Sequence, residues 1–125
     1  MISKETAPHY KWGQLCDGWR LVERPGVLSV IHERMPPTAS EVRHYHRQSR
    51  QFFFVLAGVA TMLVGDEVEH IPPQHGLEIA PGVPHQMRNE SSEPLEFLVV
   101  STPPAQGDRV VEPDVPQAFP PASGV

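Results

Sequence analysis

Three histidines and one glutamine have the spacing of a metal-binding site. His44 and His46 lie two residues apart, and side chains at that separation on a β-strand point to the same side. Gln51 follows soon after, and His85 comes directly after a loop rich in Pro and Gly, residues 80–84. A pair of imidazoles on one strand face is costly to bury without a ligand. We therefore predict that these four side chains bind a divalent metal ion inside a barrel. The alternative is a metal-free site whose imidazoles are satisfied by hydrogen bonds.

Gln51 determines which chemistry such a site supports. A carboxylate in its place would cancel one charge of the ion and could act as a base, whereas an amide offers only a neutral oxygen. The ion would keep its full double charge, which favours polarisation of a carbonyl group and a lower pKa of bound water. In a second interpretation, Gln51 only hydrogen-bonds a histidine and is not a ligand. Imidazole ligands suit Zn, Cu, Fe and Ni, and Mn is compatible with an added oxygen donor.

Short β-strands are expected to position these side chains. Fifteen prolines among 125 residues fall mostly between apolar segments and near the C-terminus, which is typical of an all-β chain with rigid turns. Residues 51–56 are apolar on both faces, so we expect one face to line the barrel and the other to be covered by a second sheet or another subunit. Residues 10–19 show no clean hydrophobic period and are expected to be irregular, with at most one short strand. Alternation and turn residues predict strands over 19–23, 27–33, 41–47, 51–56, 59–64, 67–71, 77–80, 85–89 and 95–101.

Length and composition predict one domain with one core. We expect a β-barrel over residues 1–101, with an N-terminal strap and a core at about 19–101. From Thr102 onward the chain is rich in proline. Residues 102–125 are therefore predicted to form an extended or partly disordered tail on the surface.

Several classes of function have little support. The net charge is −5 and the basic residues are scattered, so no nucleic-acid partner is expected. The single Cys16 excludes a disulfide framework within the chain. The polar N-terminus and the lack of an apolar run of ~20 residues predict a cytoplasmic protein without a membrane segment. The remaining histidines are expected to be structural or solvated: His9, His32, His70 and His75.

The stretch around the histidine pair resembles the first motif of the cupin family. That motif has His-x-His, then a Glu, and then a closing Gly. His44 and His46 take the histidine positions, Gln51 stands where the family has a ligating Glu, and Gly58 closes the motif. Residues 38–39 occupy the place of the opening Gly, which is absent here.

A second stretch resembles the second cupin motif. Gly76, Pro81, Gly82, His85 and Asn89 take its places, with four residues between Gly76 and Pro81 rather than the usual five. The two motifs together cover about the middle half of the chain. Either motif alone is weak evidence for the resemblance, whereas the two motifs together are specific.

The resemblance implies a small single-domain cupin, an all-β double-stranded β-helix or jelly-roll barrel of the RmlC-like type. It also implies a homodimer, with His44, His46 and His85 as ligands and Gln51 as a weak or conditional fourth. The metal would be Zn, Ni, Fe or Mn, and no catalytic residue can be named.

Two hypotheses for the function remain open. The first is an enzyme that acts on a small oxygenated or aromatic molecule, as a cyclase or isomerase by Lewis-acid chemistry or as an O₂-dependent dioxygenase. The missing ligand Glu favours the non-redox reactions. The second is a non-catalytic module that binds or senses a small ligand, which the lack of an obvious general base beside the metal favours.

Overall fold

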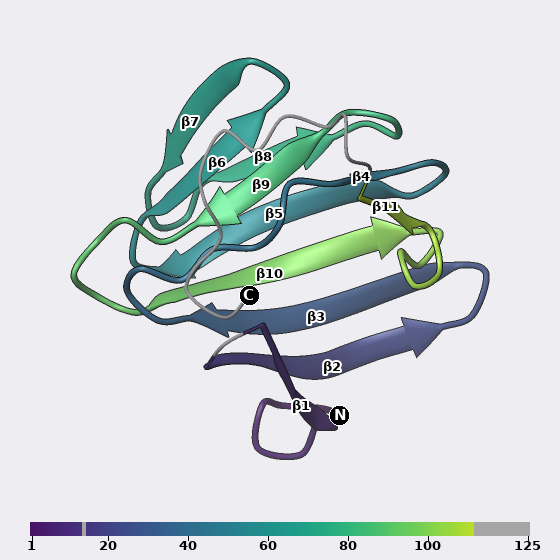
Figure 1. Cartoon of the computed structure of the whole chain (residues 1–125). Coiled ribbons are helices and arrows are strands. Elements are labelled where there is room, and N and C mark those ends of the chain that lie inside the picture. The colour runs from purple at the N-terminus through teal and green to yellow at the C-terminus, as the bar shows by residue number, and fades with distance from the viewer. Residues whose placement is uncertain (14, 112–125) are drawn as a thin grey trace.

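The structure is a computed structural model that describes residues 1–13 and 15–111 (Figure 1). This part of the chain contains β-strands and no helix, so it has no helix that could span a membrane. The strands are β1 (His9–Trp12), β2 (Cys16–Arg24), β3 (Leu28–Met35), β4 (Tyr45–His46), β5 (Arg50–Ala57), β6 (Ala60–Val64), β7 (Glu67–Ile71), β8 (Gly76–Ile79), β9 (His85–Arg88), β10 (Leu95–Thr102) and β11 (Arg109–Val110).

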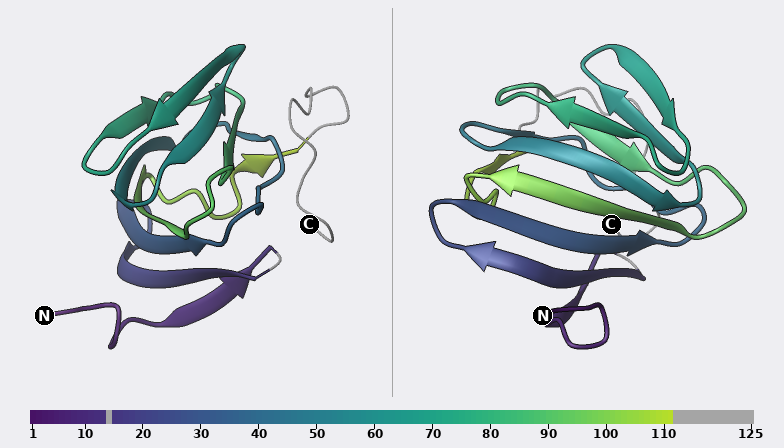
Figure 2. Two further views of the ribbon diagram at one scale, coloured as in Figure 1. Left: turned by 90° about the vertical axis from the view of Figure 1, so that its left-hand side faces the viewer. Right: turned by 180° about the vertical axis from the view of Figure 1, so that it is seen from behind.

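Two antiparallel sheets curl around one interior, and a two-stranded sheet, β11-β4, accompanies them among the described residues. The largest sheet has the strand order β1-β2-β3-β10-β5-β8, and the three-stranded sheet has the order β7-β6-β9. The left view of Figure 2 shows strands of both sheets wrapped around a common interior. Buried apolar side chains fill it, among them Met35, Phe53, Val55, Met62, Met87, Leu95 and Phe97. The all-β barrel predicted from the sequence is confirmed.

Strand β5 has the two apolar faces that its sequence predicts. Gln51, Phe53 and Val55 are buried on the inner face, whereas Phe52 on the outer face is 41% exposed. β10 lies beside β5 with Val99 opposite Phe53 and Val100 opposite Phe52. The inner sides of both strands therefore face the core, and their outer apolar side chains stay partly open within the described part of the chain.

The segment before β4 departs from the predicted strand over 41–47. Only Tyr45–His46 form a strand, and two isolated bridges, at Ser40 and His44, join the preceding residues to β9. Side chains interrupt the regular ladder here. The Glu41 carboxylate accepts the Met87 N–H at 2.9 Å, and the Gln86 side chain donates to the Glu41 carbonyl at 2.7 Å.

Residues after the barrel strand β10 pack back onto the histidine segment. β11 pairs with β4, with Arg109 opposite His46. The Asp108 carboxylate accepts the backbone N–H groups of residues 47–49 at 3.0, 2.9 and 2.8 Å. Part of the predicted tail, up to residue 111, thus lies against the loop that follows the histidine pair. Its remainder, 112–125, lies outside the described residues, and the domain boundary at 101 stays a prediction.

Two glycines of the motifs are needed where the backbone passes closely. Gly58 has a φ of 79°, and an added Cβ would lie 2.6 Å from the Pro94 carbonyl oxygen. At Gly76, an added Cβ would lie 2.8 Å from the Phe53 carbonyl oxygen. These residues allow β5 to turn past Pro94 and to pair tightly with β8.

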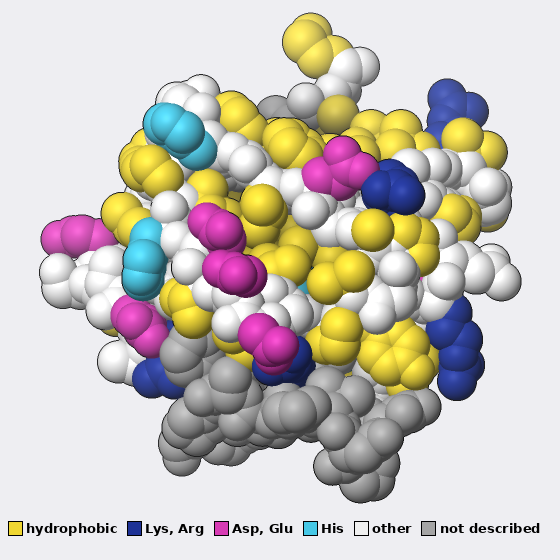
Figure 3. All heavy atoms as spheres, turned by 90° about the horizontal axis from the view of Figure 1, so that it is seen from above, with side chains coloured by type: hydrophobic (Ala, Val, Ile, Leu, Met, Phe, Trp, Pro, Cys, Tyr) yellow, Lys and Arg dark blue, Asp and Glu magenta, His cyan; other side chains and the backbone are white. Residues whose placement is uncertain are grey.

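The edge strand β7 is polar on its surface. Residues 67–70 are all exposed, and Figure 3 shows acidic side chains among apolar ones on the face seen from above. Charges on an edge strand disfavour pairing with another chain.

Candidate metal centre

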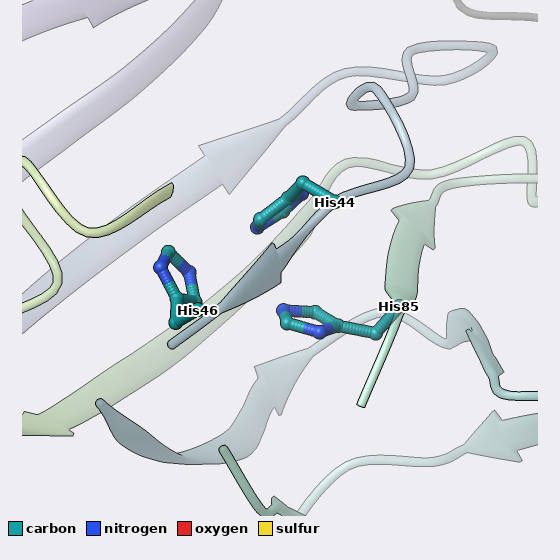
Figure 4. Close-up of side chains that lie close together, drawn as sticks. All are labelled: His44, His46 and His85. Carbon is teal, nitrogen blue, oxygen red and sulfur yellow. The ribbon is translucent and has the colours of Figure 1, made fainter. Parts of the chain in front are cut away.

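The structure brings together the three histidines that the sequence analysis groups (Figure 4). One ring nitrogen from each of His44, His46 and His85 lies within 4.8 Å of the others. The ring centroids are 4.5 Å apart for His44 and His85, 5.0 Å for His44 and His46, and 5.8 Å for His46 and His85. All three side chains are buried. In the described residues, no other group of histidine, cysteine or carboxylate side chains has this geometry.

Backbone hydrogen bonds hold the two histidine-bearing segments side by side. The His44 N–H donates to the His85 carbonyl at 3.1 Å, and the His85 N–H donates to the His44 carbonyl at 2.8 Å. The Gly82 N–H donates to the His46 carbonyl at 2.7 Å. The Pro/Gly loop before His85 is thereby fastened to β4, which explains how residues about forty positions apart converge.

The backbone also sets the orientation of two imidazoles. His44 Nδ1 lies 2.8 Å from the Val42 carbonyl, and His85 Nδ1 lies 3.0 Å from the Val83 carbonyl. Because a carbonyl only accepts, each Nδ1 carries the proton and each Nε2 keeps its lone pair. Sequence analysis missed these partners, since backbone carbonyls leave no residue pattern.

The three imidazoles are held neutral. Burial lowers the pKa of His44 to about 3, and the Arg109 cation contributes to this shift. Burial also lowers the pKa of His85 to about 4, with a further contribution from His44, and it lowers the pKa of His46. A neutral imidazole is the form that binds a metal ion.

Gln51 lies on the inner face of β5 and is buried. Its Nε2 donates to the Ser101 hydroxyl at 3.0 Å, and its Oε1 is buried without a hydrogen-bond partner among the described residues. His46 Nδ1 and His85 Nε2 are likewise buried without a partner in that part of the chain. Buried acceptors are normally satisfied, so these three atoms fit a cation.

A cavity of about 220 Å³ opens beside the histidines and is lined by His44 and Gln51. Apolar walls come from Trp12, Ile31, Phe53 and Val99. A larger groove of about 590 Å³ shares Gln106 with this cavity, and neither the three histidines nor Gln51 line it. We place the candidate site in the smaller cavity, because His44 and Gln51 line it.

The cavity contains two carboxyl groups that the sequence analysis missed. Glu33 and Glu41 both line it and remain partly exposed to it. Burial raises the pKa of Glu33 to about 8, with a contribution from Glu41, and burial also raises the pKa of Glu41. One signal in the sequence could have indicated Glu33: it shares a strand face with Ile31, where an apolar residue is expected.

Comparison with known proteins agrees with this geometry. A family model described as "Cupin domain" matches residues 31–101. The protein MJ1618 of Methanocaldococcus jannaschii is 29% identical over 80 residues, which are 63% of this chain and 64% of that protein. The present chain thus spans less than two thirds of that relative.

Solved structures share the fold. The TT1209 structure from Thermus thermophilus has a TM-score of 0.63 at 26% identity, over 69% of this chain and 83% of that one. The polyketide cyclase RemF from Streptomyces resistomycificus has a TM-score of 0.77 at 17% identity, over 90% of this chain and 84% of that one. Because the family model matches more than half of the residues, the chain belongs to the cupin family and has its double-stranded β-helix fold.

Proposed function

We propose that this cupin binds a divalent metal ion and acts on a small oxygenated or aromatic molecule by Lewis-acid chemistry. His44, His46 and His85 would be the ligands, and Gln51 a conditional fourth. The observation that carries the proposal is the meeting of three buried, neutral imidazoles at one point. A bound ion would supply positive charge that polarises a carbonyl group and lowers the pKa of bound water.

The proposed ligands are compatible with several metals. Three imidazoles and a neutral amide oxygen suit Zn, Ni or Fe, and Mn remains compatible. None of the four side chains carries a negative charge, so the ion would keep its full double charge.

The cavity suits a small substrate and a non-redox reaction. Its volume of about 220 Å³ is below the ~300–1,000 Å³ of common ligand pockets. Trp12, Phe53 and Val99 would exclude water and contact apolar parts of the substrate. Cyclisation or isomerisation of a carbonyl compound fits a site without a charged ligand, and the structural likeness to the polyketide cyclase RemF is consistent with this.

A non-catalytic binding module is the second hypothesis. Its main support is the lack of an obvious general base in the sequence. Glu33 and Glu41 line the cavity, which removes that support and favours an enzyme.

Replacement of His44 should abolish metal binding. Protein purified without added metal is expected to contain a divalent ion, and His44→Ala should lose at least about 100-fold in affinity because a direct ligand is removed. The matched control is His75→Ala, since His75 is exposed and its Nδ1 lies 3.0 Å from the Pro73 carbonyl. Elemental analysis and titration with Zn²⁺ measure both. Equal metal content in the two variants would contradict the placement.

A carboxylate at position 51 should bind the ion more tightly. Gln51→Glu adds one negative charge and is expected to raise affinity by roughly tenfold or more. Gln74→Glu is the control, because it makes the same chemical change on an exposed loop. Isothermal titration with Zn²⁺ or Ni²⁺ measures the difference. An affinity unchanged by Gln51→Glu would show that this side chain is not a ligand.

Oxygen consumption separates the possible reactions. The metal-loaded protein is expected to convert small carbonyl compounds, followed by NMR, without uptake of O₂ at an oxygen electrode. Uptake of O₂ with catechols or flavonols would instead identify a dioxygenase. Tight binding of such compounds with no turnover would identify a binding module.

We also propose a homodimer formed through the outer face of the large sheet, defined by Phe52, Phe54, Leu98 and Val100. These side chains lie together on β5 and β10 and stay partly exposed. Burying them against a second copy would gain about 25 cal/mol per Å² of apolar surface.

Phe52→Lys tests this dimer. It should shift the protein towards monomer in sedimentation experiments, because a charge would be buried at the interface. Val68→Lys is the control, since Val68 is similarly exposed on β7. A wild-type protein that is monomeric at every concentration would overturn the proposal.

A further inference from the structure

Glu33 occupies an unusual place for a carboxyl group. It lies in the middle of β3, between Gly18 of β2 and the fully buried Phe97 of β10. Its side chain lines the same cavity as His44 and Gln51. Within residues 1–13 and 15–111 its carboxyl group has no hydrogen bond or ion pair. A carboxyl group placed in a core strand without a partner is costly to folding, and this cost favours a role towards a ligand.

The neighbouring strand β2 has a glycine opposite Glu33, and a tyrosine ring from β1 lies over that glycine. Tyr10, Gly18 and Glu33 follow one another across β1, β2 and β3. A Cβ at Gly18 would lie 2.3 Å from Cζ of Tyr10, so the phenol ring lies over Gly18. Tyr10 also lines the cavity, and its hydroxyl has no hydrogen bond in the described part of the chain. A phenol hydroxyl and a carboxyl group thus line the same cavity without hydrogen bonds to residues that the structure describes, while the Arg20 guanidinium lies over the phenol ring.

The titratable and charged groups that interact electrostatically with Glu33 come from four elements. They are Tyr10 of β1, Cys16 and Arg20 of β2, Glu41 before β4 and Arg109 of β11. Burial and the Glu41 charge raise the pKa of Glu33 to about 8, and the two arginines oppose this shift. A group with a pKa near the working pH is best suited to both accept and return a proton.

We propose that Glu33 is the catalytic proton-transfer group of this cavity and that the substrate is a small enolisable carbonyl compound. The inference rests on the proposed function and deepens it. Gln51 cannot accept a proton, so a base must come from elsewhere, and Glu33 is a cavity carboxyl group without a partner. Arg109 also lines the cavity and has no ion pair in the described part of the chain, so it can balance negative charge on the substrate.

The proton transfer needs no oxidant or reductant. The Glu33 carboxylate takes the proton from the carbon next to the carbonyl group. The electron pair of that C–H bond forms the C=C bond of an enolate, and the carbonyl π pair moves to oxygen. Protonated Glu33 then returns the proton to carbon, which restores the carboxylate. In D₂O the returned hydrogen exchanges with solvent, so the step labels the substrate with deuterium.

The first test uses metal-free protein and therefore does not depend on the metal proposal. The ¹³C NMR signal of the Glu33 carboxyl carbon should titrate near pH 8. Glu33→Gln identifies this signal, and Glu67→Gln, at an exposed position outside the cavity, is the control variant that should leave it unchanged. A Glu33 signal that titrates near the ordinary value of 4.5 overturns the inference, whatever the metal content.

Stability gives a second readout on the same samples. The pKa of Glu33 is raised in the folded chain, so its contribution to stability is full below the unfolded value of 4.5 and is lost as the pH rises through about 8. As the pH rises over this range, the melting temperature of Glu33→Gln should therefore increase relative to that of the wild type. A difference that does not change with pH contradicts the inference.

The third test measures catalysis with defined probes. Protein as purified is mixed with dihydroxyacetone, pyruvate or acetylacetone in D₂O, and deuterium incorporation is followed by NMR. Exchange should be faster with wild type than with Glu33→Gln by more than about 100-fold, while both retain the same metal content and Glu67→Gln behaves as wild type. Exchange that is equal in wild type and Glu33→Gln overturns the role of Glu33. No exchange of any probe by the wild type overturns the substrate class.

Discussion

The candidate site depends on one pair of backbone hydrogen bonds. The reciprocal bonds between His44 and His85 join the segment before β4 to the start of β9. Directly opposite residues on paired strands carry side chains on the same face, so this pair fixes the separation of two imidazoles. His46, two residues along, completes the group. Backbone pairing therefore sets the geometry of the candidate metal centre.

Burial then gives the site its chemical character. The same enclosure that keeps the imidazoles neutral also keeps a proton on Glu33 at a pH where an exposed carboxyl group would have lost it. Desolvation disfavours whichever form is charged, so bases and acids move in opposite directions in one cavity. The result combines neutral imidazoles with a carboxyl group whose pKa is raised to about 8.

The parts of the site that follow local rules can be predicted from the sequence. The His44–His46 pair, the two faces of β5 and the motif glycines all depend on strand alternation or on close backbone contacts. Strand alternation places Glu33 on the same face as Ile31, but the cavity that Glu33 and Glu41 line could not be predicted. It forms only where β1, β3, Ala105, Gln106 and Arg109 meet in the folded chain. The strand over 41–47 was predicted too long, since Glu41 and Gln86 side chains replace ladder bonds there.

Asp108 accepts hydrogen bonds from the N–H groups of residues 47–49 and so holds the segment after β10 against the barrel. The barrel and this segment contribute different residues to the cavity. The histidines lie inside the stretch that the cupin model matches, residues 31–101, whereas Ala105, Gln106 and Arg109 lie beyond it and still line the cavity. A change in this short peripheral segment can alter the shape and charge of the cavity wall while the three histidines of the barrel keep their positions. Evolution or an engineer can thus vary the wall of the cavity without redesigning the histidine group.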